Sequence, residues 1–503
     1  MQNLTNSKRS VPRLWVALIP ILFLIIALST NIYIFGSDAG SGSTQIILMI
    51  ASIFCFAVAF LETGTSWDKT EKYMVKHIGD STPAIIILFL IGALSGTWML
   101  SGVVPSMIYY GLQIINPTTF LLTACVISSI VSLSAGSSWA TVATIGVAMM
   151  GVGKALGYSE GWIAGAVISG AYFGDKISPL SETTNLAANC TQTPLFKHIK
   201  NMMITTVPSY VITLILFIVA GLVIKTDGNV ELTTFTNSLA GTYNISPWLL
   251  LIPAFTFILI LKKVPTALIM IISSLVAAVV AAFYQTSLTE SITGITDNPL
   301  SAGLTAAFQS MYGSISVETG NPSLNDLVAT NGMAGMLNTT WLIIASMMFG
   351  GAMEAGGMLQ TITGHMVKFM KNTFSTVGCT TFSCLFLNTT ASDQYIAILL
   401  PGKMFSYFYK KNGYDSSLLS RTLEDSATVT SVLIPWNTCG MAQSTVLSVP
   451  TLTYLPYCFF NLLSPVMTLL VAAIGYKIKT MVTSDDFEEE TDIDVEPQVH
   501  EII

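Results

Sequence analysis

Charged residues are scarce in this 503-residue chain: Asp, Glu, Lys and Arg together make up 10% of it, whereas 52% of the residues are hydrophobic. A soluble globular domain carries about 25% charged residues. Several apolar stretches, such as 14–33, 207–224 and 264–283, reach the length of roughly 20 residues that spans a bilayer. The composition therefore excludes a soluble domain. It predicts an all-α polytopic membrane protein whose main partner is the lipid bilayer and not a nucleic acid.

Cysteine, histidine and arginine motifs are also missing. The seven Cys include no CxxC pair and the four His no HExxH, so we predict no disulfide framework, no zinc site and no bound cofactor. The chain has three arginines, and the last of them, Arg421, falls near a predicted cytoplasmic end of a span. An intramembrane arginine clamp for an organic anion is therefore not expected.

Two acidic segments nevertheless interrupt the apolar sequence. The first reads GDKISPLSETTN over 174–185, and the second reads EDSATVT over 424–430 and continues into IPWNT at 434–438. A carboxylate in a bilayer costs about 2.5–3.5 kcal/mol on insertion scales. Two such segments in related positions of two halves predict a transport site at a repeat interface.

Basic residues predict the topology, because Lys and Arg concentrate in cytoplasmic loops. Their distribution places both termini on the cytoplasmic side. The predicted organisation is a cytoplasmic N-terminus at 1–12, a first transmembrane half at 13–224, an external linker at 225–246, a second transmembrane half at 247–476 with an external segment at 285–334, and an acidic, disordered cytoplasmic tail at 477–503.

The two halves contain an internal repeat, since segment 83–224 resembles segment 335–475. The matching motifs are Ser137–Trp139 with Asp393–Tyr395, Gly157–Tyr158 with Gly413–Tyr414 and, after a short gap, Asp175 with Asp425. The distribution of Lys and Arg predicts that segment 83–108 runs from the inside to the outside, whereas segment 335–360 runs from the outside to the inside. We therefore predict two inverted-topology repeats with re-entrant hairpins and broken helices.

Each repeat also holds a polar turn within an apolar stretch. The first polar turn is 134–141 and the second polar turn is 388–394. Irregular backbone at membrane depth is tolerated only where it lines a cavity or is buried in protein, so both turns are predicted hairpin tips. The alternative is that each is an ordinary extramembrane loop.

Oxygen-bearing residues in and beside these breaks are the candidate ion ligands, because Pro breaks a helix and hard cations prefer oxygen. The predicted ion-binding residues are Asp175, Asp425, Asp393, Ser137, Ser138, Ser178, Asn185, Asn437 and Thr438, with the three Asp as direct sodium ligands. The alternative for the acids is a helix-packing polar network or a salt bridge, for instance Asp175 with Lys176. Candidate proton carriers are Asp175, Asp425 and Glu354, the last of which is alternatively a helix-end residue near the cytoplasm.

Several of these motifs resemble the signatures of NhaC-type sodium/proton antiporters. They are Ser137–Thr141, Gly170–Ser181, Arg421–Ser426 and Ile434–Gly440, and the resemblance extends from about residue 40 to 476. It implies a bacterial inner-membrane exchanger of the ion-transporter superfamily that forms a homodimer and moves like an elevator. The family also contains sodium-coupled malate/lactate exchangers. Departures from its pattern at Ala135, Ser137, Glu182 and Ser392 leave the exact substrate open.

We therefore expect a secondary active transporter, not an enzyme, that exchanges sodium for protons by alternating access. Burial disfavours a charged carboxylate, so a proton and a sodium ion compete for it. The close alternative is sodium-coupled exchange or uptake of a small carboxylate or amino acid. An intramembrane aspartyl protease is disfavoured because Tyr172 stands where Gly-x-Gly-Asp would need glycine. A passive channel is disfavoured by two inverted acidic sites.

Overall fold

The computed structural model describes residues 11–35, 42–224, 231–320, 325 and 328–478. Within these ranges the chain is helical, with one isolated antiparallel bridge between Ile315 and Thr330. Seven described helices are long and apolar enough to cross a membrane, or up to nine if each of two bent pairs is one span. The predicted all-α polytopic membrane fold is thus confirmed. The predicted disordered tail lies outside the described residues, apart from its first two positions.

The helices of the first half are α1 (Leu14–Phe35), α2 (Ser43–Thr63), α3 (Trp67–Leu100), α4 (Val103–Ile114), α5 (Phe120–Ala135), α6 (Ser138–Thr141), α7 (Val147–Ala155), α8 (Glu160–Ile177), α9 (Glu182–Cys190), α10 (Leu195–Val223) and α11 (Glu231–Thr242). Those that follow are α12 (Leu251–Leu261), α13 (Thr266–Tyr284), α14 (Thr286–Thr293), α15 (Pro299–Tyr312), α17 (Leu337–Ala355), α18 (Met358–Met366), α19 (Thr373–Thr390), α20 (Gln394–Lys411), α21 (Ser416–Leu423), α22 (Val429–Ser431), α23 (Thr438–Leu447), α24 (Thr451–Tyr454) and α25 (Phe459–Ile474). Two π-helical segments, η3 (Val142–Gly146) and η7 (Glu424–Thr428), interrupt the regular helices.

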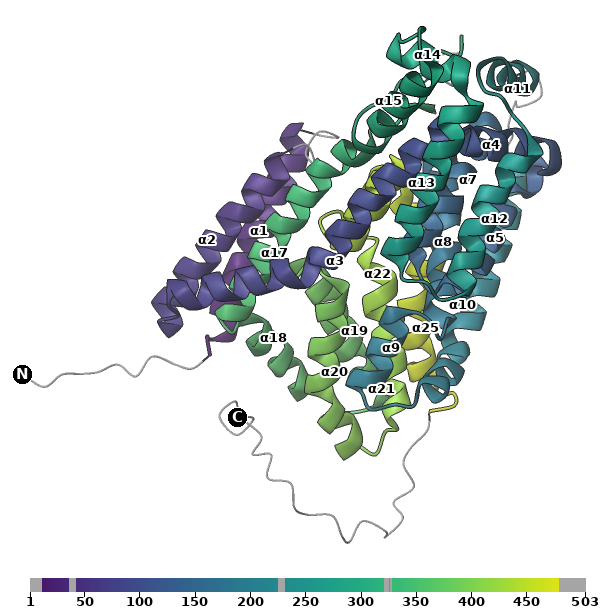
Figure 1. Cartoon of the computed structure of the whole chain (residues 1–503). Helices are drawn as coiled ribbons and strands as arrows, with labels where there is room; N and C mark the ends of the chain where they lie inside the picture. The colour runs from purple at the N-terminus through teal and green to yellow at the C-terminus, as the bar shows by residue number, and fades with distance from the viewer. Residues whose placement is uncertain (1–10, 36–41, 225–230, 321–324, 326–327, 479–503) are drawn as a thin grey trace, which may run out of the picture.

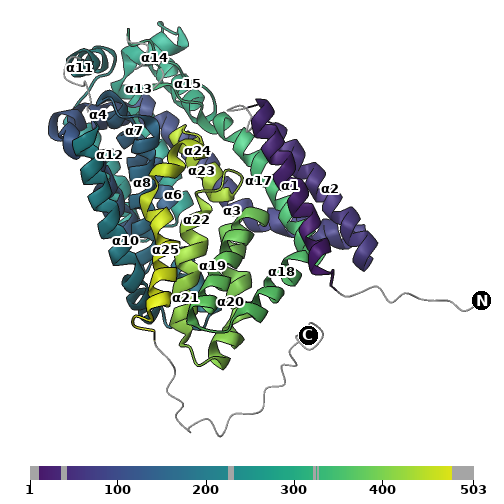
Figure 2. The ribbon, with the colours of Figure 1, turned by 180° about the vertical axis from the view of Figure 1, so that it is seen from behind.

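Helices from both halves of the chain pack together. The N-terminal helices α1 and α2 lie beside α17, and α3 crosses from this group to α13 on the other side (Figures 1 and 2). One hydrophobic core joins α1 and α2 to α17–α20, and a second joins α4, α5, α7 and α8 to parts of α10, α13 and α25. The cores therefore do not follow the division at 225–246, which stays a prediction.

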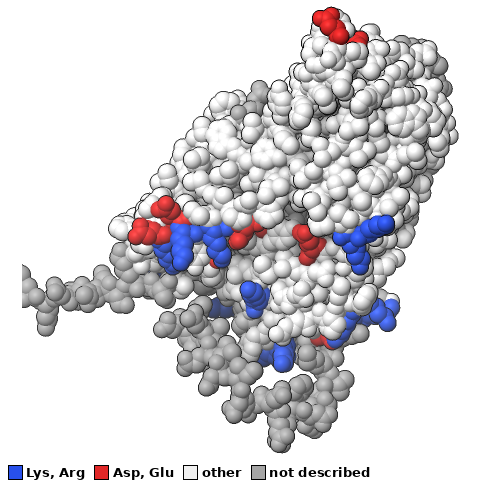
Figure 3. Space-filling view, viewed as in Figure 1, with Lys and Arg blue, Asp and Glu red and all other residues white. Residues whose placement is uncertain are grey.

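The two ends of the molecule differ in charge. Helices α9, α20 and α21 lie at one end, which we call the basic end, and α14 and α15 lie at the opposite end (Figures 1 and 2). Figure 3 shows that Lys and Arg lie over the half of this face nearer the basic end, with some Asp and Glu among them, while the far tip carries acidic side chains without basic ones. The segment predicted to be external thus lies away from the basic end. Which side of the membrane each end faces stays a prediction.

Left-handed backbone recurs at a constant interval along the chain. Gly136 and Ser392 have φ angles of 63° and 57° and lie 256 residues apart (392 − 136). The same spacing separates two further pairs with positive φ, Gly157 with Gly413 and Gln192 with Ser448. It also separates the first residues of α6 and α20, of α8 and α21, and of α9 and α23. A shared order of elements supports the internal repeat, whereas the inversion of the copies stays a prediction.

This spacing corrects the pairing of the two acidic segments. At an interval of 256 residues Asp175 corresponds to Ser431, not to Asp425. Asp175 lies in the last turn of α8, before the break that precedes α9. Asp425 lies six residues earlier in its own copy, inside η7. The gap that the sequence match required therefore reflects two different positions in the two copies. The two acids consequently have different surroundings.

Glycines set how closely α8 approaches α5. A Cβ atom at Gly170 would lie 2.1 Å from the carbonyl oxygen of Cys125. Gly170→Ala should therefore push the helices apart and lower the free energy of unfolding by roughly 1–3 kcal/mol. Gly79→Ala in α3, where nothing lies within 4 Å of the added atom, is the matched control and should be neutral or slightly stabilising. Equal thermal unfolding midpoints for both variants in detergent would contradict this packing.

Candidate functional site

A cavity of about 670 Å³ lies among elements that are far apart in the sequence. Its wall includes residues 135–140 of the first polar turn and 393–394 of the second polar turn. It also includes residues 180–183, which end the break after α8 and begin α9, and residues 263–266, which end the α12–α13 turn and begin α13. The two polar turns predicted to be functional therefore contribute to one site.

Asp175 reaches this cavity from α8. It is 7% exposed, and its Oδ2 accepts hydrogen bonds from the Ser138 backbone N–H (3.1 Å) and hydroxyl (2.7 Å). Ser138 begins α6 because the preceding Ser137 caps that helix, its Oγ accepting from the N–H of Ala140 at 3.3 Å. The positive end of a helix and two donors stabilise a carboxylate. The first polar turn thus holds the acid in place.

Asp393 reaches the same cavity from the second polar turn. It caps α20: its Oδ1 accepts from the N–H groups of Tyr395 (2.8 Å) and Ile396 (3.0 Å), and the residue is 7% exposed. The turn before it needs the left-handed conformation of Ser392, which a non-glycine residue seldom adopts. Asp393 holds the position that Ser137 holds in the first copy, 256 residues earlier. The two caps are therefore equivalent in place but differ in charge.

Neither acid forms a salt bridge with Lys or Arg in the described ranges of the chain. Two poorly solvated carboxylates without a basic partner are costly unless protons or cations neutralise them. Asp175, Asp393, Ser137 and Thr438 all line the cavity, and each has at least one side-chain oxygen. Such a set of hard oxygen atoms suits a hard cation such as sodium.

More exposed charged residues line the outer part of the cavity. They are Asp80 of α3, Glu182 of α9 and Lys263 of the α12–α13 turn. The hydroxyl of Tyr395 donates to Oε2 of Glu182 at 2.9 Å, so α9 and α20 are joined beside the cavity. With Asp175 and Asp393 the lining carries four carboxylates and one ammonium group. The cavity therefore favours positively charged occupants.

Five of the nine predicted ion-binding residues line this cavity: Asp175, Asp393, Ser137, Ser138 and Thr438. The other four lie elsewhere, and three of these brace the backbone. Ser178 donates to the Leu133 carbonyl at 2.8 Å, and Asn185 donates to the carbonyl of Pro179 at 3.0 Å. Asn437 caps α23 by accepting from the N–H of Cys439 at 3.0 Å. These contacts hold the helix breaks in shape.

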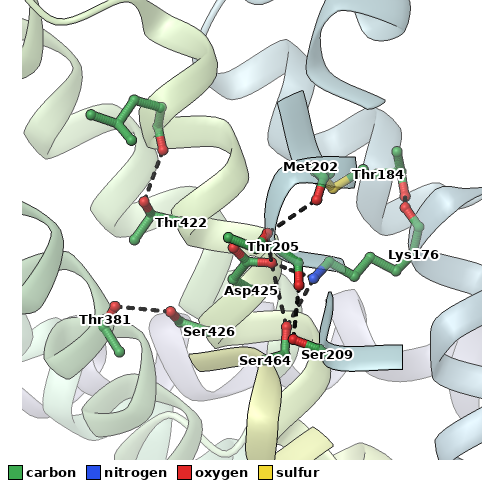
Figure 4. Close-up of polar contacts among 11 residues, drawn as sticks. Lys176, Thr184, Met202, Thr205, Ser209, Thr381, Thr422, Asp425, Ser426 and Ser464 are labelled. Atoms are coloured by element: carbon green, nitrogen blue, oxygen red, sulfur yellow. Dashed lines mark hydrogen bonds and ion pairs between the residues drawn. The ribbon is translucent and has the colours of Figure 1, made fainter. Parts of the chain in front are cut away.

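Asp425 is the fourth, and its partner is a lysine. Its side chain and that of Lys176 are fully buried and form an ion pair (Figure 4). Thr205 also donates to Oδ1 of Asp425, at 3.1 Å. The predicted alternative of a salt bridge thus applies to Asp425 and not to Asp175, and Asp425 does not line the cavity. From the sequence, Lys176 is a candidate partner only for its neighbour Asp175.

Two other charged residues also have surroundings that sequence reasoning missed. Glu354 of α17 pairs with the buried side chain of His77 in α3. Arg421 is fully buried in α21, where its Nη1 donates to Oδ1 of Asn201 at 3.2 Å, and not at a solvated end. A signal for its burial was available, because Arg421 precedes Asp425 by one helical turn and therefore shares its helix face.

Comparison with known proteins identifies the family. A family model described as "Na+/H+ antiporter family" matches residues 170–476. The chain is 36% identical over 430 residues to the Na(+)/H(+) antiporter NhaC of Alkalihalophilus pseudofirmus, covering 86% of this chain and 89% of the relative. The chain belongs to the Na⁺/H⁺ antiporter family. The predicted family is thereby confirmed, and the chain is a membrane transporter, not an enzyme.

Other relatives of this antiporter carry names with organic substrates. It is 33% identical over 480 residues to the "Arginine/ornithine antiporter ArcD" of Halobacterium salinarum, covering 95% of each chain. It is 32% identical over 432 residues to the "Malate-2H(+)/Na(+)-lactate antiporter" of Bacillus subtilis, covering 85% of this chain and 89% of that protein. Kinship alone therefore does not choose between ions and organic solutes.

Proposed function

We propose that the antiporter exchanges sodium for protons at Asp175 and Asp393. The observation that carries this proposal is that both acids line one cavity and neither forms a salt bridge in the described chain. Either a proton or a sodium ion can neutralise a carboxylate, and each disfavours binding of the other. Mutual exclusion at one site is what couples the two ions. The relative named Na(+)/H(+) antiporter NhaC supports this choice.

We propose alternating access by an elevator-like movement. The polar turns and the ends of α9, α20 and α21 would move together against α3, α12 and α13. In support, α9, α20 and α21 project beyond the α12–α13 turn at the basic end (Figure 1). The exposed residues Asp80, Glu182 and Lys263 would then line an opening toward the cytoplasm. The proposal also places both termini in the cytoplasm, the protein in a bacterial inner membrane, and two copies in a dimer.

A transport assay tests directly whether sodium and protons are the two exchanged ions. Purified protein in liposomes that enclose a pH-sensitive dye should acidify or alkalinise the lumen when a sodium gradient alone is imposed. It should also accumulate ²²Na⁺ when a pH gradient alone is imposed. Both responses are expected to vanish in protein-free liposomes. A sodium gradient that moves no protons, in protein shown to be folded, would refute sodium/proton exchange.

A second candidate is exchange of a cationic amino acid or another small organic solute. The cavity of about 670 Å³ is far larger than a bare sodium ion needs, and pockets of roughly 300–1,000 Å³ hold small molecules. Four carboxylates and Lys263 together would suit a solute with several positive groups and one carboxylate. Counterflow of labelled arginine, ornithine, malate and lactate separates this candidate from the first. Uptake of one of them at rates above that of ²²Na⁺ would favour it.

Ser138→Ala tests how the first polar turn supports Asp175. The variant removes the 2.7 Å hydroxyl donor and keeps the backbone N–H. A hydrogen bond to a charged group contributes about 1.5–3 kcal/mol, so the sodium concentration for half-maximal transport should rise by roughly tenfold or more. Ser134→Ala is the matched control, because that hydroxyl bonds only its own helix at the Ile130 carbonyl. Equal sodium dependence in the two variants would contradict the assignment.

A further inference from the structure

A second buried charge centre lies apart from the cavity. The Lys176 ammonium pairs with Asp425 and donates to the Ser464 hydroxyl at 2.9 Å. Thr205 donates to the same Oδ1 of Asp425 at 3.1 Å (Figure 4). Asp425, Thr205 and Ser464 come from η7, α10 and α25. We call these three residues the oxygen cradle. None of them lines the cavity that holds Asp175 and Asp393.

The oxygen cradle offers the atoms that a monovalent cation binds. Its polar atoms next to the ammonium are carboxylate and hydroxyl oxygens, which are the ligands that hard cations prefer. The ring of Phe460 lies 5.5 Å from the ammonium nitrogen and adds a negative π face. An ammonium group and a sodium ion carry the same charge. The side chain of Lys176 therefore places a positive charge where a free cation would meet a carboxylate oxygen, a hydroxyl oxygen and an aromatic face.

The centre also has more acceptors than its lysine can use. Oδ2 of Asp425 is buried and has no hydrogen-bond partner within the described ranges. Arg421, one turn earlier, donates to Asn201 and not to Asp425. Leaving buried acceptors unpaired costs free energy, and a packing network built only for stability would satisfy them. The surplus of buried oxygen points to a site shaped for a positive ion.

We propose that the oxygen cradle is a second monovalent-cation site, which this chain fills with its own Lys176 ammonium. The tethered charge closes the cradle to free sodium. Only the cavity site then exchanges ions, so Lys176 fixes how many sodium ions the protein binds. Lys176 would thus determine the number of sodium ions bound per protein molecule. The effect on the number of sodium ions rests on the proposed exchange at Asp175 and Asp393, whereas cation binding at the cradle can be tested independently of that exchange.

Lys176→Ala opens the cradle and tests the proposal. The purified variant should bind one further equivalent of ²²Na⁺ compared with the unmodified protein. It should also gain a sodium-dependent rise in its thermal unfolding midpoint, which ammonium or methylammonium ions reproduce. Lys154→Ala is the matched control, because it removes a partly exposed lysine paired with Glu160, and it should bind no further sodium. The double variant Lys176→Ala/Asp425→Asn removes the carboxylate charge of the cradle. It should therefore also bind no further sodium compared with the unmodified protein.

Three comparisons make the outcome decisive. Lys176→Ala in an Asp175→Asn/Asp393→Asn background should keep the new sodium-dependent stabilisation, which separates the cradle from the cavity. If folded Lys176→Ala protein can be purified only in buffers that contain sodium or ammonium ions, this result supports the proposal. Two results overturn it: a folded Lys176→Ala protein that binds no further sodium and gains no stabilisation from either ion, or a single variant that unfolds in every salt while the double variant folds.

Discussion

Asp175→Asn is expected to lower sodium-driven proton movement in proteoliposomes by about 100-fold or more. Asparagine keeps the shape of the side chain but carries neither a full negative charge nor an exchangeable proton. At 4 Å and an effective dielectric constant near 20, a unit charge contributes about 4 kcal/mol to binding of a cation. Each 1.4 kcal/mol corresponds to about a tenfold change in affinity. Because the lost group is the one that both ions share, transport and coupling should fail together.

The control for this prediction is a matched acid outside the cavity. Asp68→Asn makes the same chemical change in the first turn of α3, where the side chain is exposed. It should leave the dye signal unchanged at equal amounts of reconstituted protein. Sodium-driven proton movement at the unmodified rate in Asp175→Asn would remove this acid from the mechanism. A fall in Asp68→Asn as large as that in Asp175→Asn would show that the assay reports damage and not ion binding.

Asp425→Asn is expected to be the most destabilising isosteric change in the chain. It leaves the Lys176 ammonium fully buried without a carboxylate partner. Breaking a buried ion pair by removing one partner costs about 3–5 kcal/mol. The thermal unfolding midpoint in detergent should therefore fall sharply. Adding Lys176→Met should recover most of the loss, because the double variant buries no unpaired charge.

An exposed ion pair provides the comparison for this loss. Arg13 and Glu62 lie 3.4 Å apart with side-chain exposures of 50% and 18%. Solvent screens such a pair, so Glu62→Gln should cost only about 0–1 kcal/mol. If Asp425→Asn proves as stable as Glu62→Gln, the buried pair does not form in solution. The placement of Asp425 away from the cavity would then lose its support.

The sequence predicted the membrane fold and much of the cavity for the same physical reason. Polar residues in an apolar chain are costly, so those at 134–141 and 388–394 stand out, and the structure gives them helix-capping contacts. The same contrast predicts Asp393 within the second polar turn and Asp175 within the acidic segment 174–185. The position of polar residues within an apolar sequence does not reveal which helices pack against one another. The packing of α1 and α2 against the second half, and the join between α9 and α20, arise only from tertiary structure.

The surroundings of Asp425 could not be predicted because its partner lies 249 residues away in the sequence. Nothing in the local pattern of either segment shows that Lys176 faces Asp425 and that Asp175, one position earlier, faces Ser138. Successive residues on a helix point about 100° apart, so neighbours serve different sites. Arg421 was misplaced for a related reason. The rule that basic residues mark cytoplasmic loops does not distinguish a loop arginine from a buried one.

Sodium binding measured as a function of pH tests the central claim that sodium ions and protons compete for the carboxylates in the cavity. Equilibrium binding of ²²Na⁺ to purified protein should weaken by about tenfold for each unit of falling pH across the range in which the site takes up its proton. Each sodium bound there should release one proton into unbuffered solution, and Asp175→Asn should abolish both effects. Sodium affinity that does not change with pH, or sodium binding without proton release, would contradict the account.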